Sequence, residues 1–126
     1  MGRADKKFLA IKNIFSLLSN SPTVGSFVGN KIFPLVAPQE TSGDFIAVQR
    51  DGYRRDDTKM GVALQVSVFF ITIVSEEYDR SLMIADAVYD ALEGSHPQYE
   101  MRVRMVDYGE EYLDSKFLQV LKFNLE

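Results

Sequence analysis

The sequence predicts an α+β fold in which an antiparallel sheet of about four strands carries an N-terminal helix and a second long helix. Three observations support this fold class. A run of β-branched and aromatic residues extends over 62–74, an amphipathic segment follows at 76–93, and two alternating segments close the chain. With 126 residues, 46% of them hydrophobic, the chain is expected to form a single domain over 1–126.

The first expected element is a helix over 5–19. Apolar residues recur at helical spacing from Phe8 to Leu18, which is typical of a helix that buries one side. Asp5 is a suitable N-cap, and Asn20 is a suitable residue at which the helix ends.

A short second helix and two extended segments follow. Ser21 and Pro22 match a helix N-cap with proline at the first helical position, which predicts a helix to about Val28. Residues 31–38 are extended in character, but their two prolines restrict them to an edge strand or an ordered crossing segment. Residues 45–50 form a short predicted strand.

The central strand and the long helix hold most of the apolar pattern. Alternation along 62–74 predicts that Leu64, Val66 and Val68 share one face of the strand. The helix over 76–93 is expected to start at Ser75 and to bury the stripe Tyr78, Leu82, Ala85, Tyr89 and Leu92. Residues expected in the common core are Phe8, Phe15, Phe70, Leu82, Tyr89 and Leu121.

Two strands close the predicted sheet, at 99–108 and 116–125. Between them, residues 109–114 are polar and are expected to form the turn. The last strand alternates, with one face formed by Phe117, Gln119, Leu121, Phe123 and Leu125.

The charge is unevenly distributed along the chain. Residues 1–60 hold nine Lys or Arg and six Asp or Glu, a net charge of +3, whereas residues 61–126 hold five and twelve, a net charge of −7. Two interpretations remain open, a chance distribution over solvated surface or a bipolar surface that favours head-to-tail association of copies. No basic stripe accompanies the aromatic residues, so specific nucleic-acid binding is not predicted. No apolar run is long enough to predict a transmembrane helix.

The sequence predicts no catalytic residue, no cofactor and no metal site, and so no enzyme. His96 is the single histidine and there is no cysteine, so a zinc site is not expected and His96 is interpreted as a solvated loop residue. Asp107, Glu110, Glu111 and Asp114 could supply oxygen ligands to calcium, but their spacing matches no EF-hand loop. A hydrated acidic turn is the favoured interpretation.

The polar connection over 51–59 holds the candidate site. Two arginines could bind a phosphate there, but the two adjacent aspartates would compete with it. The segment is interpreted either as a merely solvated loop or as an exposed loop for contacts between proteins. The candidate subunit-interface residues are Tyr53, Arg54, Arg55, Asp56 and Asp57.

Three stretches, in this order, resemble the tail completion, or tail terminator, proteins of long-tailed bacteriophages. Residues 29–34, GNKIFP, are similar to that family's "v-g-x-r-i-y-p" entry into the first strand. Residues 45–50, FIAVQR, are similar to its "p-y-i-v-y-q" strand, although Phe45 stands where proline often begins it. Residues 78–92 are similar to its "a-x-x-i-a-d-a-v-r-x-a-l" helix. The resemblance covers about residues 8–125.

The resemblance implies a phage or prophage structural protein without catalytic residues. It implies a homo-oligomeric ring, typically of six subunits, that caps the finished tail tube and docks it to the head–tail connector proteins. Such a protein would be assembled in the bacterial cytoplasm, would reside in the virion at the head–tail interface, and would contact no membrane. The alternative is a small α+β ligand-binding or regulatory dimer without catalysis, which would need a pocket with convergent polar groups.

Overall fold

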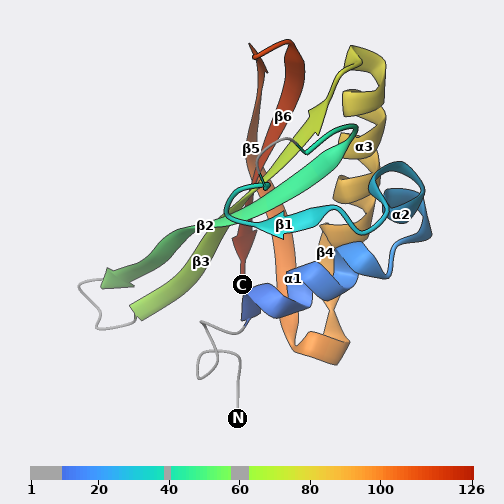
Figure 1. Ribbon diagram of the computed structural model, residues 1–126. Coiled ribbons are helices and arrows are strands. Elements are labelled where there is room, and N and C mark those ends of the chain that lie inside the picture. The colour runs from blue at the N-terminus through green and yellow to red at the C-terminus, as the bar shows by residue number, and fades with distance from the viewer. Residues whose placement is uncertain (1–9, 39–40, 58–62) are drawn as a thin grey trace.

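A computed structural model describes residues 10–38, 41–57 and 63–126 of the chain. Six strands form one curled, mixed sheet in the order β1-β2-β3-β6-β5-β4, and three α-helices lie together on one side of it (Figure 1). The strands are β1 (Ile32–Pro34), β2 (Phe45–Asp57), β3 (Ala63–Ser75), β4 (Gly94–His96), β5 (Met101–Leu113) and β6 (Lys116–Leu125). The helices are α1 (Ala10–Ser19), α2 (Pro22–Val28) and α3 (Tyr78–Leu92), with a 3-10 turn, η2 (Pro97–Tyr99).

The predicted sheet of about four antiparallel strands is therefore wrong in its strand number and its directions. β1 pairs in parallel with β2, with Ile32 opposite Ile46, and β4 adds a sixth strand beside β5. Both extra strands have only three residues, too few for alternation to be visible in a sequence. Residues 31–38 do provide the expected edge strand, and it ends at Pro34.

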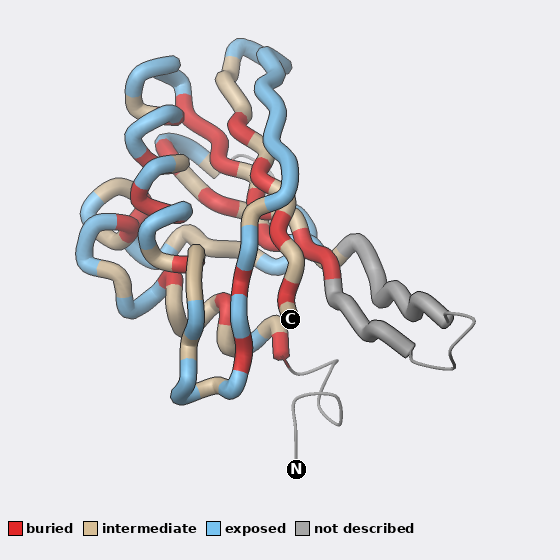
Figure 2. Tube along the Cα trace, turned by 180° about the vertical axis from the view of Figure 1, so that it is seen from behind, coloured by how far each residue is buried: buried red, intermediate tan, exposed pale blue. Residues whose placement is uncertain are grey.

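The core lies between the helices and one face of the sheet, where Figure 2 shows the buried residues gathered. Phe69 of β3 and Phe123 of β6 are 1% and 0% exposed, and their rings stack with centroids 5.4 Å apart. The expected alternation of β6 is confirmed, since Gln119, Leu121, Phe123 and Leu125 are all buried. Helix residues that meet this face include Ile14, Leu18, Ile84, Val88 and Leu92.

Several residues expected in the core lie elsewhere. Leu82 and Tyr89 are each 38% exposed, and Phe15 and Phe70 are only half-buried. Leu121 is buried as expected, and Phe8 lies outside the described residues, as does the expected start of the first helix.

A serine explains why the buried side of α3 was misjudged. Ser81 is fully buried. Its hydroxyl can be buried at little cost because it donates to the Tyr78 carbonyl at 2.6 Å and accepts from Gln119 Nε2 at 3.2 Å. The helix therefore turns Ser81, Ile84, Val88 and Leu92 to the core. A polar residue with its hydrogen bonds satisfied can occupy a buried position that an apolar pattern assigns elsewhere.

The hairpin between β5 and β6 is longer than expected. Residues 109–113 continue β5 instead of forming the turn, and Asp114 and Ser115 close the hairpin. Both residues have positive φ values, 53° and 64°, as a two-residue type I′ hairpin turn requires.

An ion pair joins the start of β2 to α3. Arg80 Nε donates to Asp44 Oδ2 at 2.8 Å, and the Arg80 guanidinium also lies over the Phe27 ring, 5.1 Å from its centroid. The hydrogen bond to Asp44 raises the pKa of Arg80. Arg80 thus ties α2, α3 and the sheet together at one point.

The N-cap of α2 forms as the sequence predicts. The Ser21 hydroxyl accepts the Val24 N–H at 3.3 Å, and Pro22 occupies the first helical position. We expect Ser21→Ala to lower the free energy of unfolding by about 0.5–2 kcal/mol, because it leaves a helix N–H without its partner. Urea unfolding followed by circular dichroism measures this. Ser26→Ala in the same helix is the control, and an equal loss there would contradict a capping role.

Candidate functional site

The candidate interface residues lie on a two-stranded arm. Residues 51–57, expected as part of a loop, continue β2 as strand, whereas residues 58 and 59 lie outside the described residues. Gly52 to Asp57 pair with Val68 to Ala63 of β3. We call residues 52–57 and 63–67 the arm. This strand was not predicted because its sequence is polar and charged and shows no apolar alternation. Its backbone hydrogen bonds to β3 do not need such alternation.

The arm extends beyond the rest of the sheet. The pairing of β3 with β6 reaches only to Ser67, opposite Leu125, and the pairing of β1 with β2 stops at Val48. Figure 1 shows the arm leaving the body on the side away from α3. The ladder between β2 and β3 has a bulge between Arg50 and Gly52, at the root of the arm. A bulge bends its strand and increases its twist, so it marks where the arm turns out of the sheet.

An open groove lies between α3 and the β5–β6 hairpin, with a volume of about 360 Å³. The helix supplies Leu82, Ala85, Asp86 and Tyr89 to one wall. Three of these residues belong to the apolar stripe that was expected in the core. Leu82 and Tyr89 of this stripe are exposed because the helix packs on the sheet through its neighbouring side, whereas Leu92 is buried as expected.

The strands supply Met105, Tyr108, Gln119 and Leu121 to the other wall of the groove. A second bulge, between Met105 and Asp107, sets this wall. Before the bulge, Met105 lies opposite Phe123 on the core face; after it, Tyr108 lies opposite Leu121 on that same face. Without the extra residue, Asp107 would take the place of Tyr108, and the groove would have a carboxylate where it now has a ring.

A polar network closes the end of the groove near the start of α3. Gln119 is 1% exposed, and its Nε2 donates to Glu110 Oε2 at 3.0 Å as well as to Ser81. Tyr78 Oη donates to the same Glu110 oxygen at 2.7 Å. This hydrogen bond is the main reason why the pKa of Tyr78 is raised. The amide of Gln119 is thus already engaged within the protein.

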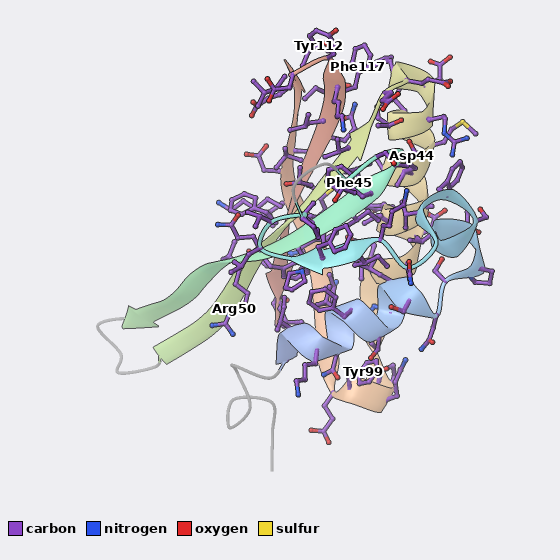
Figure 3. The ribbon with its side chains drawn as sticks, viewed as in Figure 1. Asp44, Phe45, Arg50, Tyr99, Tyr112 and Phe117 are labelled. Carbon is purple, nitrogen blue, oxygen red and sulfur yellow. The ribbon has the colours of Figure 1, made fainter. Side chains whose placement is uncertain are left out.

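The tip of the β5–β6 hairpin carries aromatic residues. The rings of Tyr112 and Phe117 are 4.8 Å apart, and Phe117 meets Tyr78 edge to face at 5.5 Å. Figure 3 shows Tyr112 and Phe117 together at this tip, far from Arg50 at the root of the arm. The start of α3 is thereby fixed to the hairpin that forms the strand side of the groove.

Two carboxylates occupy the outer edge of β5. Glu93 Oε1 accepts the Met105 N–H at 2.8 Å, and Asp107 Oδ1 accepts the Tyr108 N–H at 2.8 Å. Beyond Val103, β5 pairs only with β6 among the described residues. These side chains satisfy backbone N–H groups that a further strand would otherwise bond.

The remaining titratable candidates have structural positions. His96 is half-buried in β4 instead of solvated in a loop, and its Nε2 lies 2.7 Å from the Leu92 carbonyl at the end of α3. Asp107, Glu110, Glu111 and Asp114 are exposed along β5 and its turn. Over the part of the chain that the structure describes, no group of three or more His, Asp or Glu could hold a metal ion. Of the described helices, none has the length and apolar character needed to cross a membrane.

The fold is similar to that of a chain in a solved structure described as "Virion of native gene transfer agent (GTA) particle". The TM-score is 0.70, the sequences are 18% identical, and the match covers 89% of this chain and 89% of that chain. No protein-family model matches the sequence, and comparison with curated proteins likewise finds no match. The likeness therefore establishes a shared fold.

Sequence reasoning found the charged residues of the arm but missed the groove. Tyr53 to Asp57 are brought together with β3, and they lie away from the acidic residues of the β5 turn. The available signal for the groove was the width of the apolar pattern on α3, where two neighbouring stripes compete for the core. A helix can bury only one of two such stripes against one sheet face, which leaves the other exposed.

Proposed function

We propose that this chain is a phage-type virion structural protein, a tail terminator (tail completion) subunit that forms a ring at the head–tail joint. The observation that carries the proposal is the fold shared with a chain of a gene transfer agent virion over 89% of both chains. The resemblance of residues 29–34, 45–50 and 78–92 to the tail terminator family supports the same role from the sequence. The proposed protein is not an enzyme, and it acts through the surfaces that it presents to its neighbours.

The proposed ring contains copies of this chain, six in the form typical of the family. One side of the ring would meet the tail tube protein and the other the head–tail connector proteins, which places the protein in the virion after assembly in the host cytoplasm. The opposite net charges of residues 1–60 and 61–126 favour a head-to-tail contact between copies. A contact between unlike surfaces closes into a ring when its rotation allows.

Charge reversal on the arm tests this contact. We expect Arg54→Glu together with Arg55→Glu to shift the protein from rings to monomers, because the introduced glutamates would repel the acidic half of a neighbour. Light scattering across protein concentration, with negative-stain microscopy, measures the shift. Higher salt should also weaken the wild-type ring, since the Debye length is about 8 Å at physiological ionic strength.

A matched control separates position from net charge. Arg102→Glu with Arg104→Glu makes the same charge change on exposed residues of β5, near the opposite edge of the sheet, and should leave the ring intact. A wild-type chain that stays monomeric at high concentration and beside tail tubes would refute the ring. Normal infectious or gene-transferring particles made without this gene product would refute the role.

A further inference from the structure

We propose that the groove between α3 and the β5–β6 hairpin binds an amphipathic helix of a partner protein, with apolar residues on one side of that helix and lysine or arginine beside them. The walls of the groove, the bonded polar groups at its ends and the charges along its rim indicate this partner. The inference goes beyond the proposed function, since neither the ring nor the arm depends on this groove.

The groove is open and mostly apolar. Its lining includes aliphatic residues, a thioether and two aromatic rings, namely Leu82, Ala85, Leu121, Met105, Tyr89 and Tyr108. Leu82 and Tyr89 are each 38% exposed, and Tyr108 is 62% exposed. Exposed apolar and aromatic side chains that gather in one concave place are typical of a surface that a partner covers.

The polar groups at the two ends of the groove are already bonded within the subunit. Near the start of α3, Glu110 Oε2 accepts from both Tyr78 Oη and Gln119 Nε2. Just after the end of α3, Glu93 Oε1 accepts the Met105 N–H at 2.8 Å. The strand wall is a sheet face and not an edge, so it presents no row of backbone groups for pairing. The occupant must therefore satisfy its own backbone, as a helix does and an extended segment does not.

The dimensions of the groove suit a short helix. Its volume is about 360 Å³, and its helix wall extends from Leu82 to Tyr89. Over this length an α-helix rises about 10 Å, which is close to two turns. A partner helix would cover the groove with apolar residues at i, i+3, i+4 and i+7, the anchors by which amphipathic helices bind to apolar grooves.

The charge of the partner follows from α3. Asp86 lines the groove, and Asp79 and Asp90, seven residues before it and four after it, lie in the same row along the helix. All three are exposed, and among the described residues none of them makes an ion pair. The one basic residue of α3, Arg80, is engaged by Asp44. Lysine or arginine beside the apolar residues of a partner would neutralise this row, and such complementarity steers association and disfavours wrong partners.

Binding of a model peptide to the full chain tests the inference. The fluorescein-labelled peptide LKKLLKKLLKKL has leucine at helical spacing with lysine beside it, and LEELLEELLEEL has the same leucines with glutamate. We expect the wild type to bind the lysine peptide at least tenfold more tightly, measured by fluorescence anisotropy at physiological ionic strength. No binding of the lysine peptide, or equal binding of the two, would overturn the inference.

Two matched pairs of variants locate the binding. Ala85→Lys adds bulk and positive charge inside the groove and should weaken binding of the lysine peptide at least tenfold. Val36→Lys makes the same change of charge on a residue that is 76% exposed beyond β1, and should bind like the wild type. Asp86→Asn should weaken binding several-fold, whereas Asp114→Asn in the β5–β6 turn should not. Circular dichroism confirms that each variant is folded, and equal losses within either pair would show binding through net charge alone and refute the groove.

Methyl NMR shows where the peptide binds. Titration should shift the signals of Ala85, Met105 and Leu121, and leave unchanged that of Val24, which is buried in α2 and does not line the groove. Shifts confined to residues outside the groove would contradict the inference.

The outcomes also separate this inference from the proposed ring. If rings exclude the peptide while unassembled subunits bind it, the groove belongs to a contact between copies, and the inference fails while the ring stands. A chain that binds the lysine peptide in the groove but never assembles would refute the ring and support the inference.

Discussion

Phe69→Ala should lower the free energy of unfolding by about 3–5 kcal/mol, the range for removing a buried aromatic ring. Phe69 is 1% exposed at the centre of the sheet and stacks on Phe123, which is fully buried. The substitution removes a ring from a place where strands on both sides are fixed by the ladder, so the cavity cannot close. Urea unfolding at a fixed protein concentration measures the loss.

Leu82→Ala is the informative comparison for that experiment. Leu82 is 38% exposed on the groove wall, so its loss should cost about 1 kcal/mol or less in an unassembled subunit. Similar losses for Leu82 and Phe69 would contradict the placement of the core on the Ser81 side of α3.

Removing the arm should abolish the ring while the subunit still folds. Residues 53–67 can be replaced by Asn-Gly, which joins Gly52 to Val68, two residues that already face each other in the ladder. Asn-Gly is a preferred sequence for the two-residue type I′ turn of a β-hairpin. The core cluster of the described side chains lies outside the removed segment, so little stability should be lost.

Two measurements decide the result of arm removal. Light scattering should give the mass of a monomer at concentrations where the wild type forms rings, and thermal unfolding should remain one cooperative transition. A shortened protein that still forms rings would show that the arm is dispensable for assembly. A shortened protein that does not fold would show that the arm belongs to the core.

The sequence predicted the structure correctly where the local pattern agrees with the three-dimensional environment. Ser21 and Pro22 identified the start of α2, and the alternation of Gln119, Leu121 and Phe123 identified the buried face of β6. In both places neighbouring residues alone decide the conformation. The prolines after Phe33 indicated either an edge strand or an ordered crossing segment, and the structure has the edge strand β1.

The features that form the candidate site depend on contacts distant in sequence. The bulges after Arg50 and Met105 appear only when two strands are aligned, and the second of them brings Tyr108 to the core face. Burial of Ser81 depends on Gln119, which lies 38 residues away in the sequence. A single strand or helix read alone carries no sign of such partners, so the wide apolar pattern on α3 could not by itself show where the groove lies.

The carboxylates of Glu93 and Asp107 on the outer edge of β5 affect how readily a free subunit aggregates. An exposed strand edge is a template on which other chains add and grow without limit. Side chains that occupy its N–H groups make such growth less favourable. A free subunit is then less prone to aggregate through this edge of its sheet.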